Sequence, residues 1–175
     1  ERMIRELKFK RHCRRHSDDV YRFARSFLGQ AADAEDATQE VLLRLWKHLD
    51  SIRRVDVRPW LLKTTRNYCI DQIRRRDNQF TLLSDEELNR QPDELAVDPG
   101  RAADNADFRK QIDLALQGIS ENLRSVFVLY EINGLRYQEI ADTLEIPINS
   151  VKVYLSRARN ELKQRLTHHE SWLKV

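Results

Sequence analysis

The sequence predicts an all-α protein in which a flexible acidic linker joins two small helical domains. Glycine and proline number only four each among the 175 residues, and no long run alternates β-branched with polar residues, so strands have little support. The charge also changes along the chain: basic stretches lie on both sides of an acidic stretch over residues 77–107. Pro92, Pro99 and Gly100 interrupt that stretch, which is typical of a linker.

The first domain opens with a basic segment, residues 1–16, in which two histidines and a cysteine lie close together. These are His12, Cys13 and His16. Because no fourth ligand lies near them, a metal site is the weaker interpretation, and we expect neither a metal nor a cofactor. The apolar residues that follow keep helical spacing: Val20, Phe23, Ala24 and Phe27. Gly29 is expected to end that helix.

Residues 33–49 form the clearest helix of the first half. Asp33 is the expected N-cap, and the acids that follow it suit the positive end of the helix dipole. The inward stripe consists of Ala34, Ala37, Val41, Leu45 and either Leu49 or His48. A second stripe mixes polar and apolar side chains: Asp36, Gln39, Glu40 and Leu43, with Trp46 beside them. A mixed stripe of this kind either binds a partner or simply meets solvent.

A polar loop over residues 50–57 leads into a third helix, in which Pro59 is expected at the first position. Its inward residues are Leu62, Thr65, Cys69 and Ile73. Residues 53–76 hold eight basic side chains against Asp56 and Asp71. With Trp60, Tyr68 and Asn67 among them, this pattern suits nucleic acid, particularly unstacked bases. The alternative, arginines that complement a helix dipole, accounts for residues 74–76 but not for the arginines of the loop.

The second domain begins with two supporting helices. The first is marked by apolar residues at helical spacing: Phe108, Ile112, Ala115, Leu116 and Ile119. Ser120 is expected to cap the second, and Gly134 to end it. The inward residues of that second helix are Leu123, Val126, Phe127 and Tyr130.

Residues 135–165 contain two helical patterns with almost nothing between them. The first places Ile140, Ala141 and Leu144 on one face, and the second repeats apolar residues at helical spacing: Val151, Leu155, Ala158 and Leu162. Pro147 suits the first turn of the second helix because its φ is fixed and it lacks an N–H. A junction this short is typical of a helix-turn-helix.

The outward face of the last helix carries hydrogen-bond donors and small side chains, with no acid before Glu161. Its members are Lys152, Val153, Ser156, Arg157 and Arg159. A DNA groove offers phosphates and base edges to such a face. A basic face that only meets solvent is the alternative, and the bipartite pattern makes it less favourable.

Other classes of protein find little support in the sequence. The net charge of +3 is a weak global signal. No apolar stretch approaches the roughly 20 residues that cross a bilayer, so we expect no membrane insertion. Cys13 and Cys69 lie far apart and are expected to be reduced, in a cytoplasmic protein. No Gly-rich phosphate loop, HExxH, CxxC or nucleophile elbow occurs, so we expect no enzyme.

Three stretches stand out by their order and spacing: DAEDATQEVLLRLW at residues 33–46, RPWLLKTTRNYCIDQIRRR at 58–76 and YQEIADTLEIPINSVKVYLSRAR at 137–159. Together they resemble the bacterial RNA polymerase sigma factors of the extracytoplasmic-function (ECF) type, a resemblance that covers residues 20–166. It implies a sigma region-two helical bundle over residues 1–79, an acidic linker over 80–105, and a region-four helix-turn-helix over 106–175.

The resemblance also implies an alternative sigma factor that directs promoter-specific transcription initiation. Its implied partners are core RNA polymerase, through the β′ clamp helices and the β flap, promoter DNA and an anti-sigma factor. Docking on the clamp helices would use Asp36, Gln39, Glu40, Leu43 and Trp46. The minus-ten element would be bound by Arg53, Arg54, Trp60, Lys63, Arg66 and Asn67. The minus-thirty-five element would be read by Lys152, Val153, Ser156, Arg157 and Arg159.

Two departures and two rival functions remain. Val153 and Ser156 are small for a reading face, so the target sequence does not carry over from the family, and the basic segment over residues 1–16 has no family role. One rival is a stand-alone helix-turn-helix regulator, which would bind a palindromic duplex as a dimer without polymerase. The other is an antagonist that mimics a sigma factor on the polymerase, which would not need the basic residues 53–76.

Overall fold

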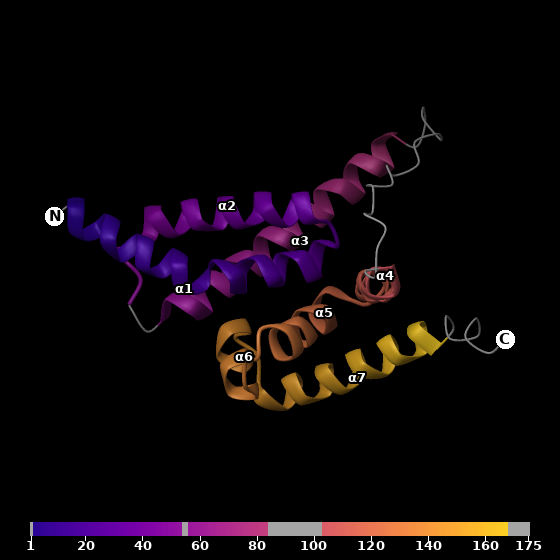
Figure 1. Cartoon of the computed structure of the whole chain (residues 1–175). Coiled ribbons are helices and arrows are strands. Elements are labelled where there is room, and N and C mark those ends of the chain that lie inside the picture. Colours follow the sequence, from indigo (N-terminus) through magenta and orange to yellow (C-terminus); the bar gives the residue numbers. More distant parts are fainter. Residues whose placement is uncertain (1, 54–55, 84–102, 168–175) are drawn as a thin grey trace.

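The computed structural model describes residues 2–53, 56–83 and 103–167. Within these ranges the chain forms helices and turns and no strand, which confirms the all-α prediction. The first half holds α1 (Arg2–Leu28), α2 (Ala31–His48) and α3 (Val57–Leu83). The second half holds α4 (Ala103–Gln117), α5 (Glu121–Phe127), the π-helical turn η2 (Val128–Ile132), α6 (Tyr137–Leu144) and α7 (Ile148–Thr167). The first three helices lie together above the second group (Figure 1).

The apolar stripes predicted for the first half are buried. On α1 the four residues Val20, Phe23, Ala24 and Phe27 are inaccessible to solvent, and on α2 so are Ala34, Ala37, Val41 and Leu45. Gly29 has a φ of +81°, a left-handed conformation that favours glycine, so it ends α1 as predicted. The basic segment at the start of the chain belongs to α1, which is 27 residues long.

Two predicted helix starts are wrong. α2 begins at Ala31, with Gln30 at the N-cap, so Asp33 lies inside the first turn. There the helix dipole still favours its charge, and its carboxylate pairs with Arg76 at 2.6 Å. α3 begins at Val57, two residues before Pro59. Pro59 is tolerated because the first N–H groups of a helix have no intrahelical partner.

The range predicted as a linker, residues 80–105, is described only at its two ends. α3 continues to Leu83 and α4 begins at Ala103, so helix occupies both ends of the expected linker range 80–105. Pro92, Pro99 and Gly100, on which the linker prediction rested, lie outside the described residues. The first helix of the second half also differs at one residue, because the side chain of Phe108 is 58% exposed and not inward.

The remaining helices of the second half follow the predicted pattern. The Ser120 side chain caps α5 by accepting a hydrogen bond from the backbone N–H of Leu123. Gly134, with a φ of +69°, follows η2. The stripe on α7 is buried at Val151, Leu155, Ala158 and Leu162. Between α6 and α7, Glu145 takes a left-handed φ of 56°, and the Pro147 carbonyl accepts the first backbone hydrogen bonds of α7.

The two halves share one hydrophobic cluster. Phe23 and Phe27 of α1 belong to the same buried cluster as Leu116, Val126 and residues of α6 and α7. Polar contacts join the halves as well: Arg25 pairs with Asp113 at 2.8 Å, and Asn133 Nδ2 donates to the carbonyl of Asp19 at 2.9 Å. The second half is therefore packed against the first in this structure.

Candidate nucleic-acid interface

The outer face of α7 is the first candidate surface. Because the buried stripe of α7 faces the core, Lys152, Val153, Ser156 and Arg157 are turned to solvent. Within the described residues, neither Lys152 nor Arg157 forms an ion pair, so both cations can meet an anionic partner. The helix thus presents two cations, one hydroxyl and one exposed apolar side chain, Val153, which is 46% exposed.

Arg159 differs from its neighbours on α7 because it is held by η2. Its Nε and Nη2 both donate to Glu131 Oε1, at 3.0 and 2.5 Å. These hydrogen bonds raise the pKa of the guanidinium. The guanidinium carbon also lies 5.3 Å from the ring centre of Tyr130, which stacks on Tyr137. Arg159 therefore ties α7 to the supporting helix.

The basic face of α3 is the second candidate surface, and the second half of the chain covers part of it. Lys63 pairs with Glu145 at 2.7 Å. Arg66 Nε donates to Ser125 Oγ at 2.8 Å, and its Nη2 donates to Asn122 Oδ1 at 3.1 Å. Burial lowers the pKa of Arg66, against the opposing effect of Glu121. These two cations are therefore engaged by α5 and by the turn after α6.

The remaining residues predicted to bind the minus-ten element lie on α3 and in the loop before it, and within the described ranges none of them forms a hydrogen bond or an ion pair with the second half of the chain. Trp60, Lys63 and Asn67 follow one another at i, i+3 and i+7, which places them on one face of α3. Asn67 is exposed, while Trp60 is half-buried with its ring centre 5.9 Å from that of His48. In the loop before α3, Arg53 pairs with Asp56 at 2.7 Å. Arg54 lies outside the described residues.

The mixed stripe of α2 is the third candidate surface. Asp36, Gln39 and Leu43 are exposed, and the apolar side chain of Leu43 is 56% exposed. Glu40 lies beside them and pairs with Arg44 at 2.8 Å. Trp46 faces α1 instead: its ring meets Phe9 edge to face with centroids 5.2 Å apart, and Arg5 lies over it. The exposed centre of this stripe is therefore Leu43.

Sequence reasoning missed a polar cluster between the halves. Asp19 accepts a hydrogen bond from Arg58 Nε at 2.8 Å, and Arg58 Nη2 donates to the carbonyl of Asn133 at 2.8 Å. Although burial alone would raise it, the pKa of Asp19 lies below its usual value because Arg58 and Arg22 hydrogen-bond to it. No local pattern reveals this cluster, because Asn133 lies 75 residues from Arg58 in the sequence.

Neither a metal site nor a membrane span is found in the described part of the chain. No group of three or more His, Cys, Asp or Glu side chains there could hold a metal ion. His12 and His16 stack with their ring centroids 6.1 Å apart. None of the helices in those ranges combines the length and apolar character that crossing a bilayer requires. Burial raises the pKa of the Cys69 thiol to about 12, as suits a core cysteine.

Comparison with known protein families gives two matches along the chain. A family model described as Sigma-70 region 2 matches residues 13–79, and a model described as Sigma-70, region 4 matches residues 109–162. The first match contains α2 and most of α3, and the second contains α5, α6 and most of α7. The basic face of α3 and the outer face of α7 thus lie in different matches.

Individual relatives give the same assignment. The chain is 34% identical over 160 residues to the ECF RNA polymerase sigma factor SigE of Mycolicibacterium smegmatis, which covers 90% of this chain but only 61% of that relative. It is 32% identical over 154 residues to the ECF RNA polymerase sigma factor SigL of Mycobacterium tuberculosis, covering 86% of this chain and 84% of the relative. Among solved structures, the sigma factor RpoE of Bartonella quintana, in complex with the anti-sigma factor NepR, matches with a TM-score of 0.70 at 27% identity, over 91% of this chain and 96% of that one.

Proposed function

This chain belongs to the extracytoplasmic-function family of RNA polymerase sigma factors, and we propose that it binds core RNA polymerase and directs transcription initiation at a specific set of promoters. The observation that carries the proposal is the exposed face of α7, on which Lys152 and Arg157 form no ion pair in the described part of the chain, while the opposite face of the helix is buried. A helix held in this way can enter a major groove while its partner helix stays in the core.

Lys152, Val153, Ser156 and Arg157 are the proposed readers of the minus-thirty-five element. Lys152 and Arg157 supply donors for guanine edges or phosphates, and each good bidentate base contact contributes about 1–3 kcal/mol of discrimination. We give Arg159 a different part within the same site. Because Glu131 holds its guanidinium, Arg159 orients α7 on η2 and contributes positive charge at the edge of the groove.

The minus-ten element is the proposed ligand of the α3 face and the loop before it. Trp60 offers a ring for stacking, which contributes about 1–3 kcal/mol per base, and Asn67 offers an amide to an unpaired base edge. Lys63 and Arg66, with Arg53 and Arg54 of the loop, supply positive charge. Because Lys63 and Arg66 are engaged by the second half, binding at this face requires that the two halves separate.

Core RNA polymerase is the proposed partner of the α2 stripe, through the β′ clamp helices. Leu43 provides the apolar centre of that surface, and Asp36, Gln39 and Glu40 provide its polar rim. Trp46 would support the surface from the side, because it packs on Phe9. The β flap is the proposed partner of the second half, which carries the minus-thirty-five readers.

The remaining expectations belong to the same proposal. The chain would divide into residues 1–79, 80–105 and 106–175, and it would act in the cytoplasm, where the polymerase is. It would need no catalytic group of its own, because the polymerase carries the chemistry. An anti-sigma factor is a further proposed partner, supported by the complex in which the similar RpoE structure was determined.

The decisive experiment is transcription in vitro with purified core polymerase on a promoter library, with and without this protein. Initiation that depends on the protein, from promoters that share a motif, is the expected result. Lys152→Ala should then change the upstream part of that motif, and Asn67→Ala the downstream part. Tight binding of the isolated chain to one duplex without initiation would overturn the proposal in favour of a stand-alone regulator. Suppression of initiation would favour an antagonist.

A further inference from the structure

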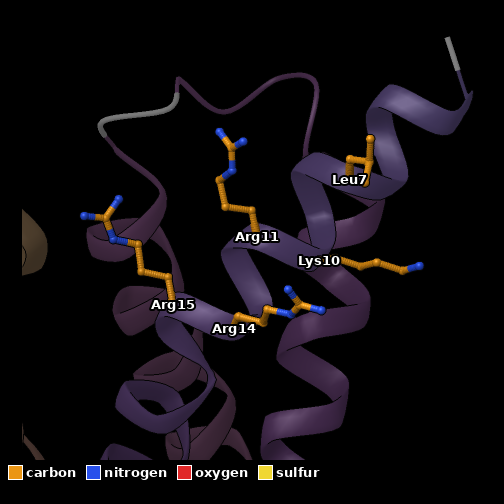
Figure 2. Close-up of a pocket in the computed structure, with 5 residues that line it drawn as sticks. All are labelled: Leu7, Lys10, Arg11, Arg14 and Arg15. Atoms are coloured by element: carbon orange, nitrogen blue, oxygen red, sulfur yellow. The ribbon is translucent and has the colours of Figure 1, made fainter.

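The start of α1 carries a basic hollow that none of the roles above uses. Four cations and one apolar side chain line it, with a volume of about 440 Å³: Leu7, Lys10, Arg11, Arg14 and Arg15 (Figure 2). The spacing explains the grouping, because Leu7, Arg11 and Arg15 follow one another at i, i+4 and i+8 while Lys10 and Arg14 are neighbours at i, i+4. Among the residues that the structure describes, no acidic side chain lines the hollow.

These four cations have no acidic partner among the described residues, and the other arginines of α1 do. Arg5 pairs with Asp50 at 3.1 Å, Arg22 with Asp19 at 2.8 Å, and Arg25 with Asp113 at 2.8 Å. The basic hollow therefore places like charges on successive turns, at Lys10 and Arg14 and again at Arg11 and Arg15. Like charges one turn apart destabilise a helix, and an anionic ligand would relieve that repulsion.

The segment of α1 that carries the basic hollow packs, through its opposite face, on the end of α2 and the start of the loop that leads into α3. Arg5 Nη2 donates to the carbonyl of Trp46 at 2.7 Å and Arg5 pairs with Asp50, so this part of α1 is fastened to the end of α2 where the loop begins. Phe9 and Ile52 pack against the same buried cluster. Arg11 and Arg15 extend toward the side of α1 on which that loop runs (Figure 2).

We propose that Lys10, Arg11, Arg14 and Arg15 bind the phosphate backbone of promoter DNA next to the bases that the loop and α3 engage. This rests on the proposed function, since it needs the minus-ten element at that loop. Residues 10–15 span about 7.5 Å of helix axis, over which duplex DNA presents about four phosphate charges. Guanidinium groups suit phosphates because their fork can donate two parallel hydrogen bonds.

The composition of the basic hollow favours a nucleic acid over a protein partner. The centre of a protein–protein interface is poor in charged residues, and lysine in particular is depleted there, whereas four of the five residues that line this hollow are charged. An anionic membrane surface is the other source of phosphate groups. It would also use the exposed apolar side chains of Met3, Ile4 and Leu7 on the first turns, so the experiment includes an arm for it.

The test compares two variants that each lose four charges. The first replaces Lys10, Arg11, Arg14 and Arg15 by glutamine. The matched control replaces Lys8, Arg109, Lys110 and Arg165 by glutamine, four exposed side chains that form no ion pair within the described ranges. Each is assembled with core polymerase, and binding to a labelled promoter is measured from low to moderate salt. Affinity for core polymerase is measured separately, and circular dichroism checks that both variants fold.

The expected result is a flatter salt dependence for the first variant alone. Each phosphate contact contributes about 0.9 to the slope of log K against log salt, so the slope should fall by roughly 2–4 and binding should weaken at least tenfold, with unchanged affinity for core. An unchanged slope would overturn the proposal. If the first variant lost affinity for core polymerase, the partner of the basic hollow would be the polymerase and not DNA. If that variant lost binding to phosphatidylglycerol vesicles and kept its DNA binding, the partner would be a membrane surface. If even the wild-type protein supports no initiation, the proposed function itself fails.

Discussion

Arg124 is a buried cation whose guanidinium joins three segments of the chain. It is 5% exposed, and it donates to the carbonyls of Phe27, Gln117 and Ile119 at 3.1, 2.9 and 3.2 Å. Its guanidinium carbon also lies 4.8 Å from the ring centre of Phe27. Burial lowers the pKa of Arg124. The hydrogen bonds offset the free-energy cost of burying the guanidinium charge, and they also satisfy three carbonyls. A buried carbonyl without a donor costs about 1–3 kcal/mol.

Arg124→Lys should therefore destabilise the protein although it keeps the charge. An ammonium cannot reproduce the fork that reaches three carbonyls. We expect a loss of about 3 kcal/mol, which lowers Tm by roughly 6–12 °C in a chain of this size, measured by thermal unfolding. Arg109→Lys, at an exposed position on α4, is the control and should leave Tm unchanged. Equal Tm values for both variants would contradict this account of Arg124.

Arg157 and Arg159 lie two positions apart on α7 and should behave differently when replaced by alanine. Arg157→Ala should relax the minus-thirty-five preference about tenfold, because a bidentate base contact contributes about 1–3 kcal/mol. It should leave Tm and initiation on a pre-melted template unchanged. Arg159→Ala should instead lower stability by about 0.5 kcal/mol, since it loses an exposed ion pair with Glu131.

Transcription assays on intact and mutated minus-thirty-five sequences, paired with thermal unfolding, measure both effects of the two arginine variants. If Arg157→Ala reduced initiation equally on duplex and pre-melted templates, Arg157 would have a structural role. If Arg159→Ala removed the sequence preference without lowering stability, Arg159 would be a reader like its neighbours.

At the scale of one element, α2 carries the stripe that packs the core on one face and the proposed docking stripe on the other. The stripe of Ala34, Ala37, Val41 and Leu45 is inaccessible to solvent, so it packs the core. The opposite stripe contributes little to that core, because Gln39 and Leu43 are exposed. A substitution on the outer stripe can therefore change a partner's affinity without unfolding the helix.

Gln39→Ala combined with Leu43→Ala should weaken binding to core RNA polymerase at least tenfold while Tm stays within about 2 °C of wild type. An exposed Leu at the centre of an interface can contribute more than 1 kcal/mol when it is covered by the partner. Surface plasmon resonance with immobilised core measures the affinity. Asp107→Ala, at an exposed position on α4, is the control. Unchanged affinity of the double variant would remove this stripe from the proposed docking surface.

At the scale of the whole molecule, the packing of the two halves controls access to α3. The second half supplies acceptors to the cations of α3: Glu145 to Lys63, Ser125 and Asn122 to Arg66, and Glu121 to Arg74. The proposed minus-ten surface is therefore partly covered in this arrangement. Promoter binding at this proposed surface would replace these contacts with contacts to phosphates and bases.

Glu121→Gln combined with Glu145→Gln should raise the affinity of the isolated chain for a single-stranded minus-ten oligonucleotide. Both substitutions keep the shape of the side chain and remove the charge that holds Arg74 or Lys63. Exposed ion pairs contribute at most about 1 kcal/mol each, so we expect a gain of about threefold to tenfold by fluorescence anisotropy. Glu139→Gln on α6 is the control. An unchanged or lower affinity would mean that these contacts do not restrict the surface.

The parts of the fold that were predicted correctly depend on local periodicity. The stripes on α1, α2 and α7, the ends of helices at Gly29 and Gly134, and the Ser120 cap follow from the spacing and backbone chemistry of neighbouring residues. The errors were also local: Asp33 suits an N-cap and Pro59 a first helical position, yet the N-cap of α2 lies three residues earlier and α3 begins two residues earlier. Residues that favour a helix start can occupy several positions of the first turn. They therefore predict that a helix is present more reliably than they predict which residue begins it.

The candidate surfaces also have a part that the local sequence predicted and a part that only tertiary contacts decided. The outward faces of α2 and α7 were predictable, because a residue opposite a buried stripe on one helix is exposed unless another element covers it. Which cations stay unpaired was not predictable, because it depends on contacts between residues far apart in the chain. Arg66 meets Ser125 across 59 positions and Arg58 meets Asn133 across 75, and only the packing of the second half on the first brings these groups within hydrogen-bond distance.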